Sequence, residues 1–526
     1  MTRLATYFII FFVFALSEYA QSQSLYNQAA YIPPQCYVKT QSEGKTHNPC
    51  FACHTDSLEP NFINDGDTQL EYGFQDYSRR NRWSNLFQNR AHDMSKIKDS
   101  QIIEYVNRSN YLSEDGHILI TKSYLESQKE WDVNGDGKWS GYVPDSYFNF
   151  DQDGFDRDLN NEYTGWRSYL YFPFPGLFVP SAGSFGDVLI RLPEIYRMTK
   201  SGEFGIDIYK INLAIVESLI KQKDIAIPSV NEQVLGVDLN RNNQLDMASK
   251  IVFYQNAVDG SGMQYVGLAG DLQNKNKVKL AAGFFPLNTE FLHSVRYLAV
   301  NDSNITMAKR LKELRYAKKV GWTERVFHEQ FAVAEAQERE LFPQQLMRVA
   351  GNQETGVFNG LGWKYQGFIE DKSGELRPQN YEEHVFCVGC HSALGVLSDS
   401  NFSFSRKVAY QLGKKDWGHW SQFTFNYLFS EMEEHYAEYI KENDGLIDYR
   451  VKKYEAYASI MDMLMPSASE AMQMNKSYKV IVDEQSFIYG RDANTQSLET
   501  VYRVVKPGQK TGITSPKVVD KKNYPL

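Results

Sequence analysis

The spacing of apolar residues along this chain predicts helices in several places. Apolar residues recur at intervals of three and four over residues 95–107 and over residues 305–319, which is the period of an amphipathic helix. Thr323 can cap a further helix that runs to about residue 341 and ends before Pro343. Residues 381–395 are also expected to be helical.

The middle of the chain has a different pattern. Short runs rich in β-branched and aromatic residues, such as Lys250–Tyr254 and Val278–Ala282, predict strands joined by turns. Glycines punctuate residues 356–370, which predicts a hairpin. From residue 131 to residue 162, Asp, Asn and Gly dominate and periodicity is absent, so this segment is expected to be loop.

These patterns predict an α+β protein of several domains. Mainly helical regions at both ends of the chain are expected to flank a middle rich in strands and loops. The length of 526 residues is enough for roughly two to four domains of ordinary size. Hydrophobic residues make up 42% of the chain, which is enough for packed cores, and the net charge of −9 argues against nucleic acid as a partner.

The first residues have the pattern of a secretory signal peptide. Arg3 precedes an apolar run from about Tyr7 to Leu16, and small residues follow near Ala20. The run is too short to span a bilayer comfortably, and no cysteine that could carry lipid follows it. We therefore expect cleavage near residue 22, no later membrane span, and export to the periplasm or the cell exterior.

Four of the five cysteines lie in two strings of the same form, C-F-A-C-H at residues 50–54 and C-V-G-C-H at residues 387–391. C-x-x-C-H is the attachment signal for c-type haem, in which two thiols bond to the porphyrin and the histidine binds the iron. A redox dithiol would not need the histidine, whereas a zinc site could combine both strings. We expect two covalent haem groups, with His54 and His391 as proximal ligands. The cysteines that would carry them are Cys50, Cys53, Cys387 and Cys390.

The distal ligands of these haem groups are less well defined. His47 and His384 each precede a string by three residues, and each could bind the other iron or hydrogen-bond a propionate. Met465 stands before a proline well downstream of the second string, but a methionine at helical spacing is more often a core residue. The competing histidines and methionine are His92, Met94, His117, His293, His419 and His435.

Three loops have the alternating oxygen donors that calcium prefers. The expected ligands are Asp132, Asn134 and Asp136 in the first loop, Asn149, Asp151 and Asp153 in the second, and Asp238, Asn240 and Asn242 in the weaker third. All three lack the glutamate that EF-hand loops carry at position 12, so the resemblance is to calcium loops in general. Solvated acidic turns are the alternative. Bound calcium would stiffen the chain and would not signal.

The two strings resemble those of dihaem c-type cytochromes, and the whole chain is similar to large, exported, uncharacterised dihaem proteins. The 332 residues between the strings, and the calcium-like insert, depart from the pattern of dihaem peroxidases. The resemblance implies electron transfer through two haem groups, with partner proteins or small molecules as donors and acceptors. The alternatives are a dihaem oxidoreductase of peroxidase type with one open iron site, and a calcium-stabilised surface or scaffold protein.

The expected organisation follows from these assignments. The basic residues between 309 and 319 would lie on a solvated helix face or dock an acidic redox partner. The predicted regions are a signal peptide at 1–22, an N-terminal haem region at 23–130, a β- and loop-rich middle at 131–300, a helical segment at 301–350 and a C-terminal haem region at 351–526.

Overall fold

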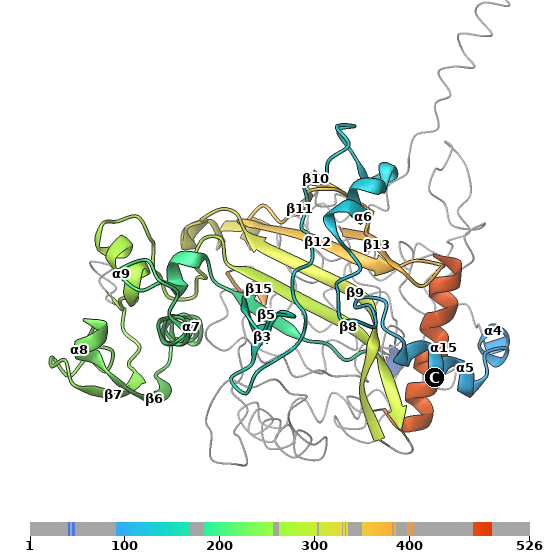
Figure 1. Ribbon diagram of the computed structural model, residues 1–526, viewed down its shortest axis with the longest axis horizontal. Coiled ribbons are helices and arrows are strands. Elements are labelled where there is room, and N and C mark those ends of the chain that lie inside the picture. The colour runs from blue at the N-terminus through green and yellow to red at the C-terminus, as the bar shows by residue number, and fades with distance from the viewer. Residues whose placement is uncertain are drawn as a thin grey trace, which may run out of the picture.

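The structure is a computed structural model, and Figure 1 shows its course. It describes residues 91–168, 183–255, 262–301, 304–328, 350–380 and 466–485, with shorter pieces at 40–42, 45–47, 330–331, 333–334, 383–384, 397–399 and 401–402. Both C-x-x-C-H strings, Cys36, Met465, His419 and His435 lie outside the described residues.

A nine-stranded antiparallel sheet forms the centre of the described fold. The strand order is β10-β11-β12-β9-β8-β5-β4-β3, and β13 pairs with β12. The bounds are β3 Phe155–Arg157, β4 Tyr163–Ser168, β5 Val188–Arg191, β8 Glu290–Asn301, β9 Asn304–Lys319, β10 Ala350–Asn352, β11 Gly356–Phe358, β12 Trp363–Glu370 and β13 Leu376–Pro378. Three two-stranded pairs accompany it: β1 Thr40–Ser42 with β2 Lys45–His47, β6 Ile225–Asn231 with β7 Met247–Ile251, and β14 Leu397–Ser398 with β15 Asn401–Phe402.

Helices lie at the two ends of this sheet in Figure 1. At one end, α7 (Ile206–Lys221), α8 (Glu232–Leu235) and α9 (Gly267–Asn274) accompany β6 and β7. At the other end, α15 (Ala468–Glu484) packs with α4 (Ala91–Ser95) and α5 (Asp99–Asn107). Other described helices are α6 (Lys122–Ser127) and the 3-10 turns Lys129–Trp131 and Glu194–Arg197.

The predicted fold class is therefore wrong. The described residues are mostly β-structure around one antiparallel sheet, rather than helical regions that flank a β-rich middle. The sheet draws its strands from between residues 155 and 378, so it spans three of the regions that we expected to be separate. Long-range pairing, which no local pattern reports, builds this core.

The clearest error is the helix expected over residues 305–319, which is the long strand β9. A β-bulge interrupts its pairing with β8, because Val295 pairs with Glu313 whereas Arg296 pairs with Leu311. The extra residue places Leu311 and Leu314 in the same core cluster, three positions apart. That spacing imitates a helix. Arg310, Lys312 and Lys319 are buried, so the expected basic helix face does not exist.

Other local predictions fared differently. The helix over 95–107 is confirmed in α5, although residues 96–98 are not helical and separate it from α4. The hairpin over 356–370 is confirmed as β11 and β12. The strand expected at Lys250–Tyr254 ends at Ile251, and residues 278–282 form no strand. Residues 325–328 are helical, as expected for the segment after Thr323.

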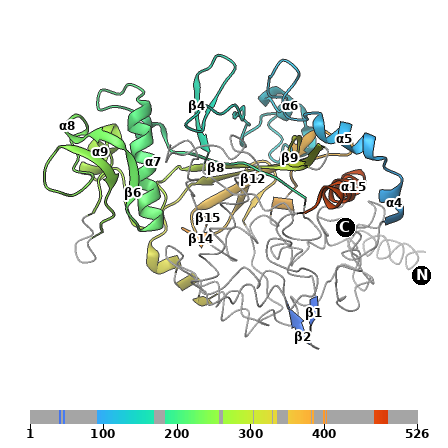
Figure 2. The same cartoon turned by 90° about the horizontal axis from the view of Figure 1, so that it is seen from below.

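The two faces of the sheet are covered differently. On one face, Leu292, Leu314 and Phe368 pack with Trp166 and with the segment that carries α6. On the other face, Phe291, Ala317, Tyr365 and Trp363 belong to a second cluster that extends to α7. Figure 2 shows β14 and β15 on the side of β12 that is opposite to β4 and α6.

Candidate functional site

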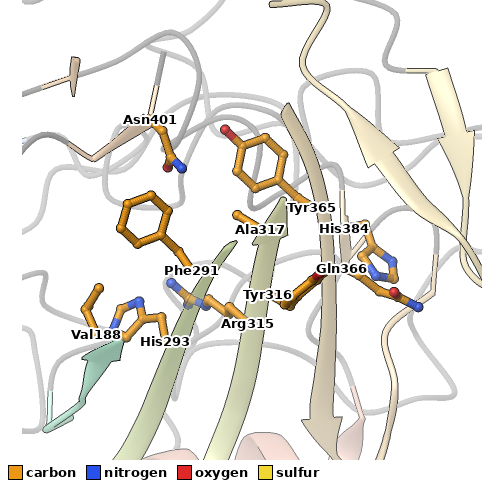
Figure 3. A pocket seen from close by; sticks show the side chains of 10 residues that line it. All are labelled: Val188, Phe291, His293, Arg315, Tyr316, Ala317, Tyr365, Gln366, His384 and Asn401. Carbon is orange, nitrogen blue, oxygen red and sulfur yellow. The ribbon is translucent and has the colours of Figure 1, made fainter. Parts of the chain in front are cut away.

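A pocket opens on the sheet where β5, β8, β9 and β12 lie side by side (Figure 3). Its lining residues are Val188, Phe291, His293, Arg315, Tyr316, Ala317, Tyr365, Gln366, His384 and Asn401. The cavity measures about 40 Å³. Pockets that enclose a whole ligand hold roughly 300–1,000 Å³, so this one can receive an edge or a substituent.

Strand register explains the shape of the pocket. Val188, His293, Arg315 and Gly367 stand in one row across β5, β8, β9 and β12. In Figure 3, Phe291 and His293 lie on one side, Tyr365 and His384 lie on the other, and Arg315 and Ala317 lie between them. The short side chain of Ala317, in the next row on the same face, leaves room beside Arg315, whereas Gln379 fills the space next to Gly367.

His384 closes one end of this row. Its Nε2 atom accepts the backbone N–H of Gly367 at 3.0 Å, and its Nδ1 atom donates to the carbonyl of Asn380 at 2.8 Å. The residue is buried, and this burial lowers the pKa of its ring to about 4. The imidazole is therefore neutral at physiological pH, and the Gly367 bond occupies the lone pair that a metal would need. This geometry favours a positioning role over iron ligation.

His293 and Arg315 supply the polar side of the pocket. Burial, and secondarily the charge of Arg315, lowers the pKa of His293 to about 3. The Nε atom of Arg315 donates to Glu313 Oε2 at 2.8 Å, which fixes the guanidinium beside the cavity. A neutral imidazole is the form that binds metals, and a guanidinium pairs with carboxylates. With its apolar walls, this set of residues can receive an apolar edge that carries a carboxylate.

A second buried cluster lies beside Asn401, at the ends of β9 and β12. The Asp399 carboxylate accepts Lys319 Nζ at 2.6 Å and the backbone N–H of Phe285 at 3.1 Å, both at Oδ2. The carbonyl of Asp399 accepts Trp363 Nε1 at 2.7 Å. Burial raises the pKa of Asp399 to about 6, and His328 Nε2 lies 3.7 Å from its other oxygen. Sequence reasoning missed this cluster because Lys319 and Asp399 are 80 residues apart in the chain.

The first and third predicted calcium loops have the same internal structure. Position 1 accepts the N–H of position 6 at 2.8 Å in the 132–137 loop and at 2.9 Å in the 238–243 loop. Position 3 accepts the N–H of position 5 at 3.0 Å in both loops, and position 5 accepts the N–H of position 7 at 2.8 Å in both. Positions 4 and 6 have positive φ, as Gly135 and Gly137 in one loop and as Arg241 and Asn243 in the other.

A buried glutamate from outside completes each of these two loops. Glu354 accepts the N–H groups of Val133 and Ser140, which are positions 2 and 9 of the first loop, at 3.0 and 3.1 Å. Glu232 accepts the N–H groups of the same two positions in the third loop, at 2.6 and 3.2 Å. Sequence reasoning missed both glutamates because neither has the position-12 spacing.

The second predicted loop is a tight turn that is closed by an isolated bridge between Phe150 and Asp156 and leads into β3. Asp151 pairs with Arg157 at 3.0 Å, and Asp153 pairs with Lys210 at 2.6 Å. The backbone N–H of Asn149 donates to Asp156. Two of the three expected ligands are therefore already neutralised by cations. Among the described residues, no three His, Cys, Asp or Glu side chains form a metal-binding group.

The other predicted site residues are spread over the fold. His47 ends β2, His92 and His117 are exposed, and Met94 packs in a small cluster with Val480. His92, His117 and Met94 do not line the pocket, whereas His293 and His384 both do. Across the described residues, no helix is both long and apolar enough to cross a membrane.

Comparison with known proteins gives a family and no activity. A lipoprotein family model matches residues 20–437. An uncharacterised lipoprotein of Aquifex aeolicus (strain VF5) is 28% identical over 553 aligned positions, which cover 91% of this chain and 88% of the relative. No solved structure matches the chain.

Proposed function

This chain belongs to that lipoprotein family, and we propose that it is exported and transfers electrons through two covalently attached haem groups. Bound haem would supply a one-electron iron couple at each C-x-x-C-H string. The protein's contribution would be to hold each group, to exclude water from it and to set its electrostatic surroundings.

The position of His384 is the observation that carries this proposal. His384 lines the pocket and precedes Cys387 by three residues. Three residues of extended chain span at most about 11 Å, so a group attached at Cys387 has the pocket within reach. The pocket thus offers apolar walls, a neutral imidazole and a guanidinium within reach of a group attached at Cys387.

Each lining residue has a distinct part in this proposal. Phe291 and Tyr365 would contact an apolar ring edge, and Arg315 would pair with a propionate. His293 stays uncharged because burial lowers its pKa to about 3, so it would add no positive charge beside the iron. A dry, apolar contact of this kind limits solvent reorganisation and tunes the redox potential.

Structural calcium is a second part of the proposal, and it is confined to the first and third loops. Their shared hydrogen-bond pattern, and the buried Glu354 and Glu232 that close them, support it. Carbonyl, amide and carboxylate oxygens on a tight loop are the ligands that calcium prefers. We do not propose calcium binding for the second loop, because Asp151 and Asp153 are paired with the cationic side chains of Arg157 and Lys210.

The test is chemical analysis of the full chain, produced in a host that attaches c-type haem. The pyridine haemochrome spectrum and the intact mass should show two haem groups per chain. Replacing Cys387 and Cys390 with serine should remove one group, and the same change at Cys50 and Cys53 should remove the other. A chain that carries zinc and no porphyrin would contradict the proposal.

Spectroscopy then separates electron transfer from the alternatives. An electron carrier should show six-coordinate, low-spin iron at both strings and rapid reduction by a small donor in stopped-flow experiments. One high-spin iron would favour the peroxidase-type oxidoreductase instead. Haem that is reduced slowly or not at all would favour the scaffold protein.

A further inference from the structure

We infer that Lys319 and Asp399 become joined by an amide bond within the chain. The bond forms between the lysine Nζ atom and the side-chain carboxyl carbon of the aspartate, with loss of one water molecule. It is a cross-link made only from groups of this chain. The inference is therefore independent of the proposed haem groups and calcium ions, and it stands or falls without them.

The two reacting groups are already in contact. Lys319 ends β9, and its Nζ atom lies 2.6 Å from Oδ2 of Asp399, which directly follows β14. Lys319 also donates to the carbonyl of Phe285 at 2.8 Å, and Trp363 Nε1 donates to the carbonyl of Asp399 at 2.7 Å. Both partners are thus held by further hydrogen bonds. Well-oriented groups in one molecule react as if their local concentration were about 10⁵ M or more.

Burial distinguishes this pair from the other ion pairs of lysine. Among the lysine–carboxylate pairs of the described residues, it alone has two side chains that are 0% exposed. The ring centroid of Trp322 lies 4.4 Å from Lys319 Nζ, and that of Phe284 lies 5.3 Å from it. Such surroundings favour uncharged groups over two charges that water cannot hydrate. They also exclude the water that would hydrolyse an amide.

The first step is a proton transfer within the pair. An ammonium group has no lone pair, so the lysine must pass a proton to the carboxylate before its nitrogen can attack. Burial raises the pKa of Asp399 to about 6 and lowers the pKa of Lys319. Both shifts reduce the free-energy cost of this transfer, because that cost depends on the difference between the two pKa values. The transfer consumes no external acid or base.

The two carboxyl oxygens of Asp399 have different surroundings, and this difference assigns their fates. Oδ2 accepts the backbone N–H of Phe285 at 3.1 Å, and this donor would stabilise the negative charge that develops on Oδ2 during attack. Among the described residues, none forms a hydrogen bond with Oδ1, and His328 Nε2 lies 3.7 Å from it. Oδ2 therefore remains as the amide oxygen, and Oδ1 leaves as water.

His328 is placed to move the proton that completes the reaction. After attack, the nitrogen must lose one proton, and Oδ1 must gain one to leave as water. Burial, and secondarily the charge of Lys319, lowers the pKa of His328 to about 4, so its ring is neutral and can accept the first proton and deliver it to Oδ1. The sum is one ammonium and one carboxylate converted into one amide and one water.

The test is mass spectrometry of the full chain after denaturation and proteolysis. We expect the segments that hold Lys319 and Asp399 in one branched peptide, lighter than the sum of the two by one water molecule. An ion pair separates on denaturation, whereas an amide bond survives it. The wild-type chain gives the answer without any variant. Recovery of the two segments as separate peptides of unchanged mass would overturn the inference.

The matched internal control is the pair of Lys210 and Asp153. Its Nζ–Oδ2 distance is also 2.6 Å, but the two side chains are 32% and 33% exposed. Water can hydrate both charges there, so this pair should yield two separate, unmodified peptides. A branched peptide at Lys210 and Asp153 as well would show that contact alone suffices, and it would overturn the argument from burial.

A variant assigns the bond to its lysine. K319R keeps a cation beside Asp399, but a guanidinium stays protonated and has no free lone pair for attack. We expect no branched peptide from K319R. A loss of water that persists in this variant would place the modification at another site and would contradict the inference.

The rate of bond formation tests the part of His328. Chains sampled at intervals after a short pulse of synthesis should accumulate the branched peptide about 100-fold more slowly in H328Q than in the wild type. The reason is that a glutamine side chain can donate a hydrogen bond but cannot carry a proton from one atom to another. A structural role alone would lower the melting temperature and leave the rate unchanged. That result would overturn the assignment of His328 to the reaction.

Discussion

His384 Nε2 accepts the N–H of Gly367 at 3.0 Å, so a side chain completes the edge of β12 where a neighbouring strand would otherwise do so. The bond requires a neutral ring with its proton on Nδ1, and this N–H donates a hydrogen bond to the carbonyl of Asn380. A protonated His384 could not accept the bond. Folding and the charge of this ring are therefore linked.

The first prediction concerns pH. Because the pKa of His384 falls from 6.5 to about 4 on burial, the unfolded chain binds a proton between these values that the folded chain does not. The stabilisation is fully present above pH 6.5 and is lost as the pH falls toward 4. Each unit of pKa difference is worth about 1.4 kcal/mol. As the pH falls, the free energy of unfolding should therefore decline less steeply for H384Q than for the wild type. Urea unfolding across this range, with H117Q as an exposed control, measures it, and equal slopes would refute the linkage.

The second prediction concerns the Lys319–Asp399 pair. Removing one partner leaves the other charge buried, so K319M should lower the free energy of unfolding by about 3–5 kcal/mol. The double variant K319M/D399N should recover part of this loss. Chemical denaturation of both single variants and the double variant gives the coupling energy. The exposed pair of Lys250 and Asp224 is the control, and its coupling should stay below about 1 kcal/mol. Additive effects at Lys319 and Asp399 would be the contrary result.

The third prediction concerns calcium. Calcium should raise the melting temperature of the full chain, and chelation should lower it, because binding to the folded state alone is stabilising. D136A and D238A, in the first and third loops, should each reduce this shift. D153N, in the second loop, should leave it intact because Lys210 already pairs with that carboxylate. A shift that D153N abolishes, or that all three variants leave unchanged, would argue against this assignment.

The fourth prediction concerns Lys312, whose Nζ donates to the carbonyl of Gly183 at 2.7 Å. Burial lowers the pKa of Lys312 from 10.5 to about 7. The unfolded chain therefore holds a proton between pH 10.5 and pH 7 that the folded chain has lost, so wild-type stability falls as the pH decreases across this range. K312M should lack this pH dependence, so its stability relative to the wild type should increase as the pH falls from 10 to 7. Melting curves at several pH values test this, and parallel curves would contradict it.

Local sequence predicted those elements whose signals are local. The α5 helix and the β11–β12 hairpin follow from apolar spacing and from glycine-marked turns. The Asx hydrogen bonds of the 132–137 and 238–243 loops are also local, since each joins residues of one short segment. By contrast, the apolar spacing of β9 wrongly predicted a helix, because a bulge brings Leu311 and Leu314 to one face of the strand.

The sequence by itself determined the two C-x-x-C-H strings and the oxygen-rich loops from which the haem and cation sites are proposed, because both patterns depend on neighbouring residues. Only the tertiary structure decided which histidines share a pocket. It also decided that Glu354 and Glu232 contact the two loops, and that Asp399 pairs with Lys319. Those contacts follow from antiparallel pairing between segments far apart in the chain. The physical reason is that strand register and burial, which select these partners, depend on the whole sheet and leave no mark within a short window of sequence.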